Sequence, residues 1–170
     1  GESGVTSVEA LRGDRFWTAL ESGRWESGGW DRRLMDAALA RSNQLNSPRA
    51  TYSNAFPTTA DLRRLAPDSY AYRFEYADGL RATIVQFKAA AGQANGGVVG
   101  DCNVAARLRG GDTFSVQFYL PYSTMRNFFS PFVHHIEAFF RNRRSLYPVE
   151  RTLLTGGILD RALHSRFEKG

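Results

Sequence analysis

Two pairs of alternating segments dominate the middle of the chain. Aromatic residues occupy every second position in Tyr70–Tyr76, and a second alternating run, 80–86, follows a turn at Gly79. Because successive side chains of a strand point to opposite faces, this pattern predicts a β-hairpin. A three-residue loop with Gly79 left-handed places Glu75 opposite Arg81 and keeps the apolar rows together, whereas a two-residue loop would mix the faces. We therefore expect the three-residue loop.

Segments 104–109 and 113–120 repeat this design around a second turn, Gly110-Gly111. Their apolar side chains alternate onto one face, which holds Val104, Ala106, Leu108, Phe114, Val116 and Phe118. The sequence therefore predicts two consecutive hairpins.

Helical periodicity flanks the hairpins on both sides. A short first strand, 5–11, leads into a helix that Asp14 is placed to cap, and a second helix is expected to start at Asp31. Two further helices follow Ser130-Pro131 and Tyr147-Pro148. These elements predict one α+β domain over residues 1–170, with an open, mainly antiparallel β-sheet and helices packed on one face. We expect the two C-terminal helices to cover the aromatic face, which includes Tyr72, Phe74, Val116 and Phe118.

The opposite sheet face is the candidate substrate or interface face. It is polar in character but also carries apolar side chains, which would form an exposed patch if nothing covered them. A second copy of the chain is the expected cover, and the alternatives are segment 42–68 or another domain. The candidate residues are Arg73, Arg81, Phe87, Arg107, Arg109, Gln117 and Tyr119.

Composition narrows the classes of protein that the chain can belong to. The chain has 170 residues, a net charge of +5, and 22 basic residues of which only Lys88 and Lys169 are lysine. One cysteine, Cys102, excludes an intrachain disulfide and a four-cysteine zinc site. No apolar run has the length of a membrane span, so we expect a cytoplasmic protein with no membrane partner. Arginines scattered without a basic run do not favour a nucleic-acid partner.

Candidate chemistry is sparse in this sequence. No two of the 16 glycines are separated by one residue, so the chain lacks the glycine spacing that binds a dinucleotide pyrophosphate. His134 and His135 are adjacent on a predicted helix and diverge, while Asp160 and His164 share one helix face without a nucleophile. Cys102 has no neighbour in sequence that would activate it. We assign no catalytic, cofactor-binding or metal-binding residue, and we expect no cofactor on this chain alone.

Three segments resemble the C-terminal half of Gfo/Idh/MocA-like oxidoreductases: residues 147–160 with Ser165-Arg166, residues 76–81, and residues 1–5. The resemblance implies an α+β domain that contacts a small-molecule, sugar-like substrate and forms homo-oligomers. It also implies an N-terminal Rossmann domain, absent here, that binds NAD(P) in the full-length protein. The family's Glu-Lys-Pro motif has no match at Lys88 or Lys169. The spacing of Asp160 and His164 matches a family pair, but its position near the C-terminus does not, so we transfer no role to it.

Three functional readings follow from these observations. The first is the substrate-binding and oligomerisation domain of such an oxidoreductase, not catalytically complete alone. The second is a non-catalytic module that binds a ligand or protein through the arginine-rich sheet face. The third, nucleic-acid binding, would require salt-sensitive affinity for unrelated sequences.

Overall fold

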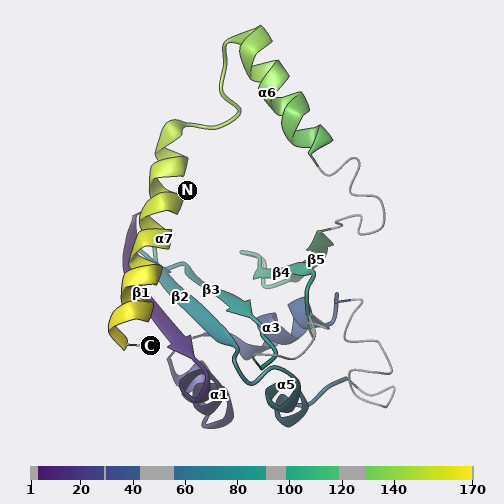
Figure 1. Ribbon diagram of the computed structural model, residues 1–170, viewed down its shortest axis with the longest axis vertical. Coiled ribbons are helices and arrows are strands. Elements are labelled where there is room, and N and C mark those ends of the chain that lie inside the picture. Colours follow the sequence, from purple (N-terminus) through teal and green to yellow (C-terminus); the bar gives the residue numbers. More distant parts are fainter. Residues whose placement is uncertain (1–3, 29, 43–55, 91–98, 119–128, 170) are drawn as a thin grey trace.

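The strands and helices form three layers in the computed structural model, which describes residues 4–28, 30–42, 56–90, 99–118 and 129–169 (Figure 1). The strands are β1 (Val5–Arg12), β2 (Tyr70–Tyr76), β3 (Arg81–Gln86), β4 (Cys102–Arg107) and β5 (Thr113–Phe118). The helices are α1 (Asp14–Glu21), α2 (Arg24–Ser27), α3 (Arg32–Leu39), α5 (Thr59–Leu65), α6 (Ser130–Asn142) and α7 (Val149–Lys169). The predicted α+β class with antiparallel sheets is confirmed.

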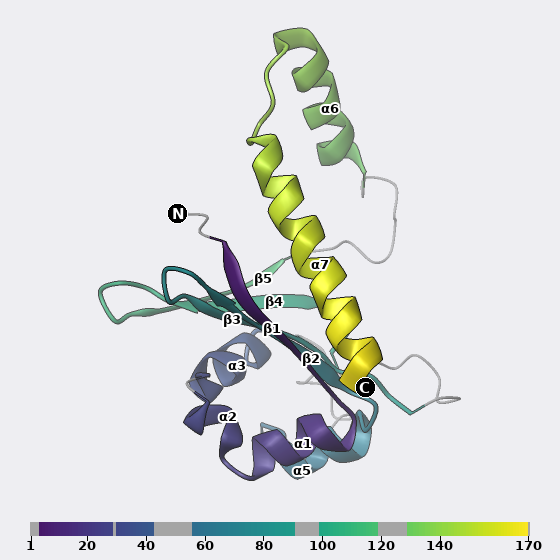
Figure 2. The ribbon, with the colours of Figure 1, turned by 90° about the vertical axis from the view of Figure 1, so that its left-hand side faces the viewer.

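The sheets lie between the N-terminal helices on one side and α7 on the other (Figure 2). One sheet has the strand order β1-β2-β3, and β4 and β5 form a separate two-stranded sheet. Both hairpins have the expected register, with Glu75 opposite Arg81 and Val104 opposite Val116. Gly79 and Gly111 adopt positive φ angles of 83° and 91°, which glycine tolerates without strain. The three-residue loop at Gly79 is therefore confirmed.

The hydrophobic core lies between the three-stranded sheet and the N-terminal helices. Phe16 and Trp17 of α1 are fully buried, and their ring centroids lie 4.8 Å apart in an edge-to-face arrangement. The Trp17 indole Nε1 donates a hydrogen bond of 3.1 Å to the Pro67 carbonyl, so its polar group is satisfied inside the core. Trp25 and Phe87 complete the aromatic cluster.

Helix α7 packs against β1 and the start of β2 from the other side of the sheet. The Ser165 hydroxyl accepts a 3.0 Å hydrogen bond from the Ala10 backbone N–H. The Arg166 guanidinium lies 4.9 Å from the Tyr70 ring centroid and 3.4 Å from the Tyr72 hydroxyl oxygen, and both contacts raise the pKa of Arg166. Among the described residues, no helix combines the length and the apolar character that a membrane span requires.

We expected both C-terminal helices to cover the aromatic face. For the part of this face that lies on β5, the expectation is wrong. Phe118 is 57% exposed, and no residue of α6 is buried. Helix α6 stands away from the sheets (Figure 1). Tyr72 contacts α7 and Phe74 is buried, as expected. The sheet's other face carries Phe87, and it is this face that the apolar side chains of α1 and α2 cover.

Asp31 joins α3 to the β4–β5 hairpin. Its carboxylate caps α3 by accepting a hydrogen bond from the Arg33 backbone N–H at 2.9 Å, and it also pairs with the Arg107 guanidinium. The cap expected at Asp14 is not formed, because Gly13 is the N-cap of α1 and provides no side-chain hydrogen bond. Burial raises the pKa of Asp31. The hydrogen bonds from Arg107 and the Arg33 backbone, together with the charge of Arg107, lower it by more, so the net pKa lies below the ordinary value. The carboxylate form is therefore the stabilising one.

Replacing Asp31 with asparagine is expected to lower the free energy of unfolding by about 0.5–1 kcal/mol at pH 7, because Arg107 is half exposed. A folded-state pKa below the ordinary value stabilises the protein above about pH 4, and the stabilisation is lost as the pH falls through the folded-state pKa. Urea unfolding of both proteins at pH 7 and pH 3 measures the difference. An equal difference at both pH values would contradict the assignment. Asp31→Ala, which also removes the cap, should cost about 1 kcal/mol more.

Candidate functional site

The face expected to bind a substrate or a second copy is largely covered by the chain's own N-terminal helices. Phe87 is 6% exposed and its ring packs edge-on against Phe16, with ring centroids 6.4 Å apart. Arg73 is also 6% exposed. These two side chains contact the protein's own core, which differs from the expectation that they would contact a second copy. Phe87 belongs to the core cluster of the chain, and Val85 packs against that cluster.

Arg73 lies between two tryptophans of the N-terminal layer. Its guanidinium carbon is 5.1 Å from the Trp25 ring centroid and 4.6 Å from that of Trp30, and Nη2 donates to the Trp25 carbonyl at 3.3 Å. Glu9 approaches Nη1 at 3.6 Å. Burial lowers the pKa of Arg73 more than the charge of Glu9 raises it, and Arg81 lowers it further. Arg73 is thus a cation held inside the fold by aromatic rings.

The remaining candidate residues are spread over separate contacts. Arg81 pairs with Glu75 at 3.1 Å in the first hairpin, and Arg107 pairs with Asp31. Gln117 donates to the Asp101 carboxylate at 2.5 Å. Arg109 is exposed at the end of the second hairpin, and Tyr119 lies outside the described residues. The described candidates therefore form separate contacts, and they do not converge on one exposed site.

The candidate chemical groups also lie apart. The rings of His134 and His135 on α6 are 5.8 Å apart, centroid to centroid, and the His164 Nδ1 lies 3.8 Å from an Asp160 oxygen on α7. Cys102 is an exposed free thiol at the start of β4. Within the parts of the chain that the structure describes, no three metal-ligating side chains come together.

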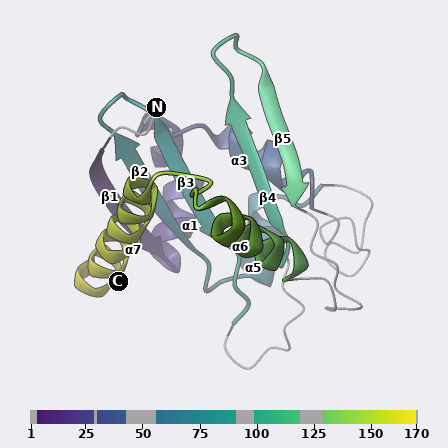
Figure 3. The same ribbon diagram turned by 90° about the horizontal axis from the view of Figure 1, so that it is seen from above.

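The sequence pattern predicts that the apolar side chains of both hairpins are buried. In the structure, six of them form an exposed apolar surface on the α7 side of the sheets. In each hairpin these residues share one strand face, and the faces opposite to them carry the contacts with the N-terminal helices. Figure 3 shows the backbone of both hairpins from the α7 side. We call this surface the open face. It consists of six side chains that are 42–57% exposed: Leu80, Ile84, Val104, Leu108, Phe114 and Phe118. Cys102 shares this face, because it pairs with Phe118 across the hairpin.

A second apolar surface follows the two C-terminal helices. Proline at the start of α6 and a left-handed residue, Arg143, at its end delimit a helix that has no buried residue in the described part of the chain. Phe140 is 72% exposed and Phe167, near the end of α7, is 91% exposed. The stripe on α6 consists of Phe132, Val133, Ile136, Phe139 and Phe140. Both helices therefore expose the kind of residue that folded chains normally bury.

Searches with this chain against protein-family models, curated proteins and solved structures gave no match.

Proposed function

We propose that the chain is the substrate-binding and oligomerisation domain of a Gfo/Idh/MocA-like oxidoreductase, and that it self-associates through the open face. The observation that carries the oligomerisation part is the open face itself: six large apolar side chains of the two hairpins are about half exposed. The resemblance of residues 147–160, which form the first half of α7 and the residues before it, supports the family part.

The size of the open face supports an assembly role. With side chains of this size about half exposed, the six residues offer about 500 Å² of apolar surface. The largest apolar patch of a typical monomer is roughly 300–600 Å² and is often functional, so this patch lies toward the upper end of that range. A two-fold pairing would place the same surface of each copy against the other, as a symmetric interface requires.

The chain's own residues do not fit a nicotinamide dinucleotide. The turn from β1 to α1 is the place where a strand leads into a helix N-terminus, the arrangement that binds phosphate. This turn has one glycine, Gly13, and Asp14 places a carboxylate in the first helical turn. A carboxylate there repels phosphate. In the proposal, NAD(P) belongs to a separate N-terminal domain, and the exposed stripes of α6 and α7 are the surfaces against which that domain packs.

The alternative function, a ligand- or protein-binding module that uses the arginine-rich face, has less support. That reading requires several arginines to be accessible together. Arg73 is enclosed by Trp25 and Trp30, and Arg107 is paired with Asp31. Binding through these side chains would first have to break contacts within the chain.

Self-association is tested by sedimentation of the 170-residue chain combined with alkylation of its one cysteine. Cys102 is exposed on the open face, so a dimer formed there is expected to shield the thiol from a bulky maleimide. Raising the protein concentration should increase the sedimentation coefficient and slow the alkylation in parallel. Alkylation in denaturant provides the unshielded rate. A protein that stays monomeric at high micromolar concentration, with a constant alkylation rate, would contradict the proposal.

A further inference from the structure

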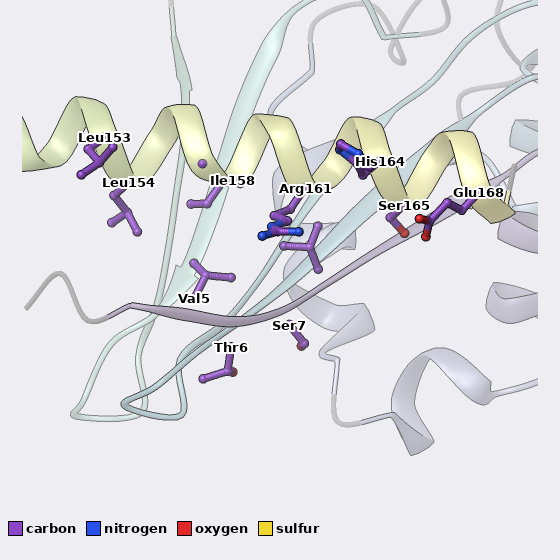
Figure 4. A pocket seen from close by; sticks show the side chains of 12 residues that line it. Val5, Thr6, Ser7, Leu153, Leu154, Ile158, Arg161, His164, Ser165 and Glu168 are labelled. Carbon is purple, nitrogen blue, oxygen red and sulfur yellow. The ribbon is translucent and has the colours of Figure 1, made fainter.

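A groove of about 570 Å³ runs between β1 and the inner side of α7 (Figure 4). One wall consists of residues Val5–Val8, and the other includes Leu154, Ile158, Arg161 and His164. The groove lies at the β1 edge of the three-stranded sheet, whereas the open face includes residues at its β3 edge. The groove is therefore not part of the proposed self-association surface.

The groove follows the free edge of the sheet. Strand β1 is the edge strand of the order β1-β2-β3, and four consecutive residues of it line the groove although their side chains alternate between the two faces. The Ala10 backbone N–H points outward, because it donates to Ser165 of α7 instead of to β2. Backbone groups of an antiparallel strand alternate in direction, so the N–H and carbonyl of Val8 point outward as well, into the groove.

The helix wall has one apolar end and one polar end. Leu154 and Ile158 lie near Val5, and Gly157 between them leaves room because no atom lies within 4 Å of the position that a Cβ would occupy. Arg161 projects into the space between α7 and β1 and forms no ion pair or hydrogen bond with the described residues. Glu168 lies at the far end of the groove, so a carboxylate ligand is favoured at Arg161 and disfavoured beyond it.

We infer that this groove binds an extended peptide segment, which adds to the outer edge of β1 as a further strand and carries an acidic side chain opposite Arg161. A free strand edge beside a helix supplies both parts of such recognition: main-chain hydrogen bonds give affinity, and side-chain pockets give specificity. The guanidinium can hold a carboxylate with two hydrogen bonds. An apolar side chain of the peptide occupies the end formed by Val5, Leu154 and Ile158. The exposed length of β1 accommodates a segment of about four or five residues at about 3.3 Å per residue.

The probe is a fluorescent five-residue peptide, acetyl-Thr-Val-Glu-Val-Thr-amide, titrated into the 170-residue chain and followed by anisotropy. Two matched probes carry lysine in place of the glutamate or an N-methyl group on the second valine. We expect the first probe to bind, and the lysine probe to bind at least about tenfold more weakly because like charges meet at Arg161. The N-methylated probe should bind more weakly as well, because it lacks one main-chain donor. Absence of binding, or equal binding of all three probes, would overturn the inference.

Two neighbouring glycines of α7 supply a matched pair of variants. Gly157 lines the groove, whereas Gly156 does not, and a Cβ at either position meets no atom within 4 Å. Leucine is a better helix former than glycine, so Gly157→Leu and Gly156→Leu are both expected to fold with no loss of thermal stability. Gly157→Leu should weaken the peptide by at least about tenfold because it fills the groove, and Gly156→Leu should leave the affinity unchanged.

The same variants distinguish the peptide from a second copy of the chain. If Gly157→Leu leaves peptide affinity unchanged, the groove is not the binding site and the inference is overturned. If the peptide fails to bind and Gly157→Leu instead reduces self-association, paired β1 edges occupy the groove, which also overturns it. Self-association through the open face predicts no effect of Gly157→Leu on the sedimentation coefficient, so the two proposals fail independently.

Discussion

Phe87→Glu is expected to unfold the protein. The Phe87 ring is 6% exposed and contacts the rings of Phe16 and Trp17, so the substitution removes an aromatic side chain and places a carboxylate among apolar groups. Losing the ring alone costs about 3–5 kcal/mol, and an unpaired buried charge adds several more. A domain with a total stability of about 5–15 kcal/mol does not tolerate such a loss. Far-UV circular dichroism and urea unfolding measure it directly.

The matched control for this variant is Ile84→Glu, on β3, three residues earlier in the chain. Ile84 is 56% exposed on the open face, so its replacement should change the free energy of unfolding by less than about 1 kcal/mol. A folded Phe87→Glu protein would contradict the position of Phe87 in the core. An unfolded Ile84→Glu protein would show that the open face is covered within the monomer.

Phe118→Glu is expected to disperse the self-associated protein without unfolding it. Phe118 is 57% exposed in the single chain, so a glutamate there remains solvated in the monomer. In a two-fold pairing, each copy would bury this carboxylate against the apolar face of the other. We expect the dimer dissociation constant to rise by about a hundredfold, which corresponds to about 2.7 kcal/mol. Sedimentation over a range of concentrations measures this change.

Phe167→Glu is the control for that experiment. Phe167 is the most exposed of the large apolar side chains that the structure describes and lies near the end of α7, outside the open face. The same charge introduced there should leave the dissociation constant within about threefold of the unmodified protein. Equal effects of Phe118→Glu and Phe167→Glu would mean that net charge, and not the open face, controls association.

The sequence predicted local features better than it predicted which helices cover which face. The register at Glu75 and Arg81 follows from one glycine turn, and the helix start at Asp31 follows from the local pattern, so neighbouring residues are sufficient to specify them. The cover of Phe87 depends on Phe16 and Trp17, which lie some 70 residues earlier in the chain. Period-2 alternation cannot identify the outer face when apolar residues occur on both faces, as Ile84 and Val85 do here.

The burial of Arg73 and Phe87 depends on the same kind of long-range contact. Arg73 was expected on an exposed face because arginine is usually solvated, but cation–π contacts with Trp25 and Trp30 stabilise it inside the fold. The open face was expected to be buried because its residues are apolar. The β1–α7 groove had no signal in the sequence, since it depends on which strand lies at the sheet edge.

The two halves of the open face belong to separate sheets. The β4–β5 hairpin has no strand partner in the three-stranded sheet, and it is joined to α3 and the residues after it by the Arg107–Asp31 ion pair and the Arg41–Ser115 and Ser42–Asp101 hydrogen bonds. Ion pairs at a protein surface weaken with salt and acid, whereas the aromatic core does not depend on either. Because part of this attachment is electrostatic, we expect salt and acid to weaken the attachment of the β4–β5 hairpin to α3 while the aromatic core keeps its stability.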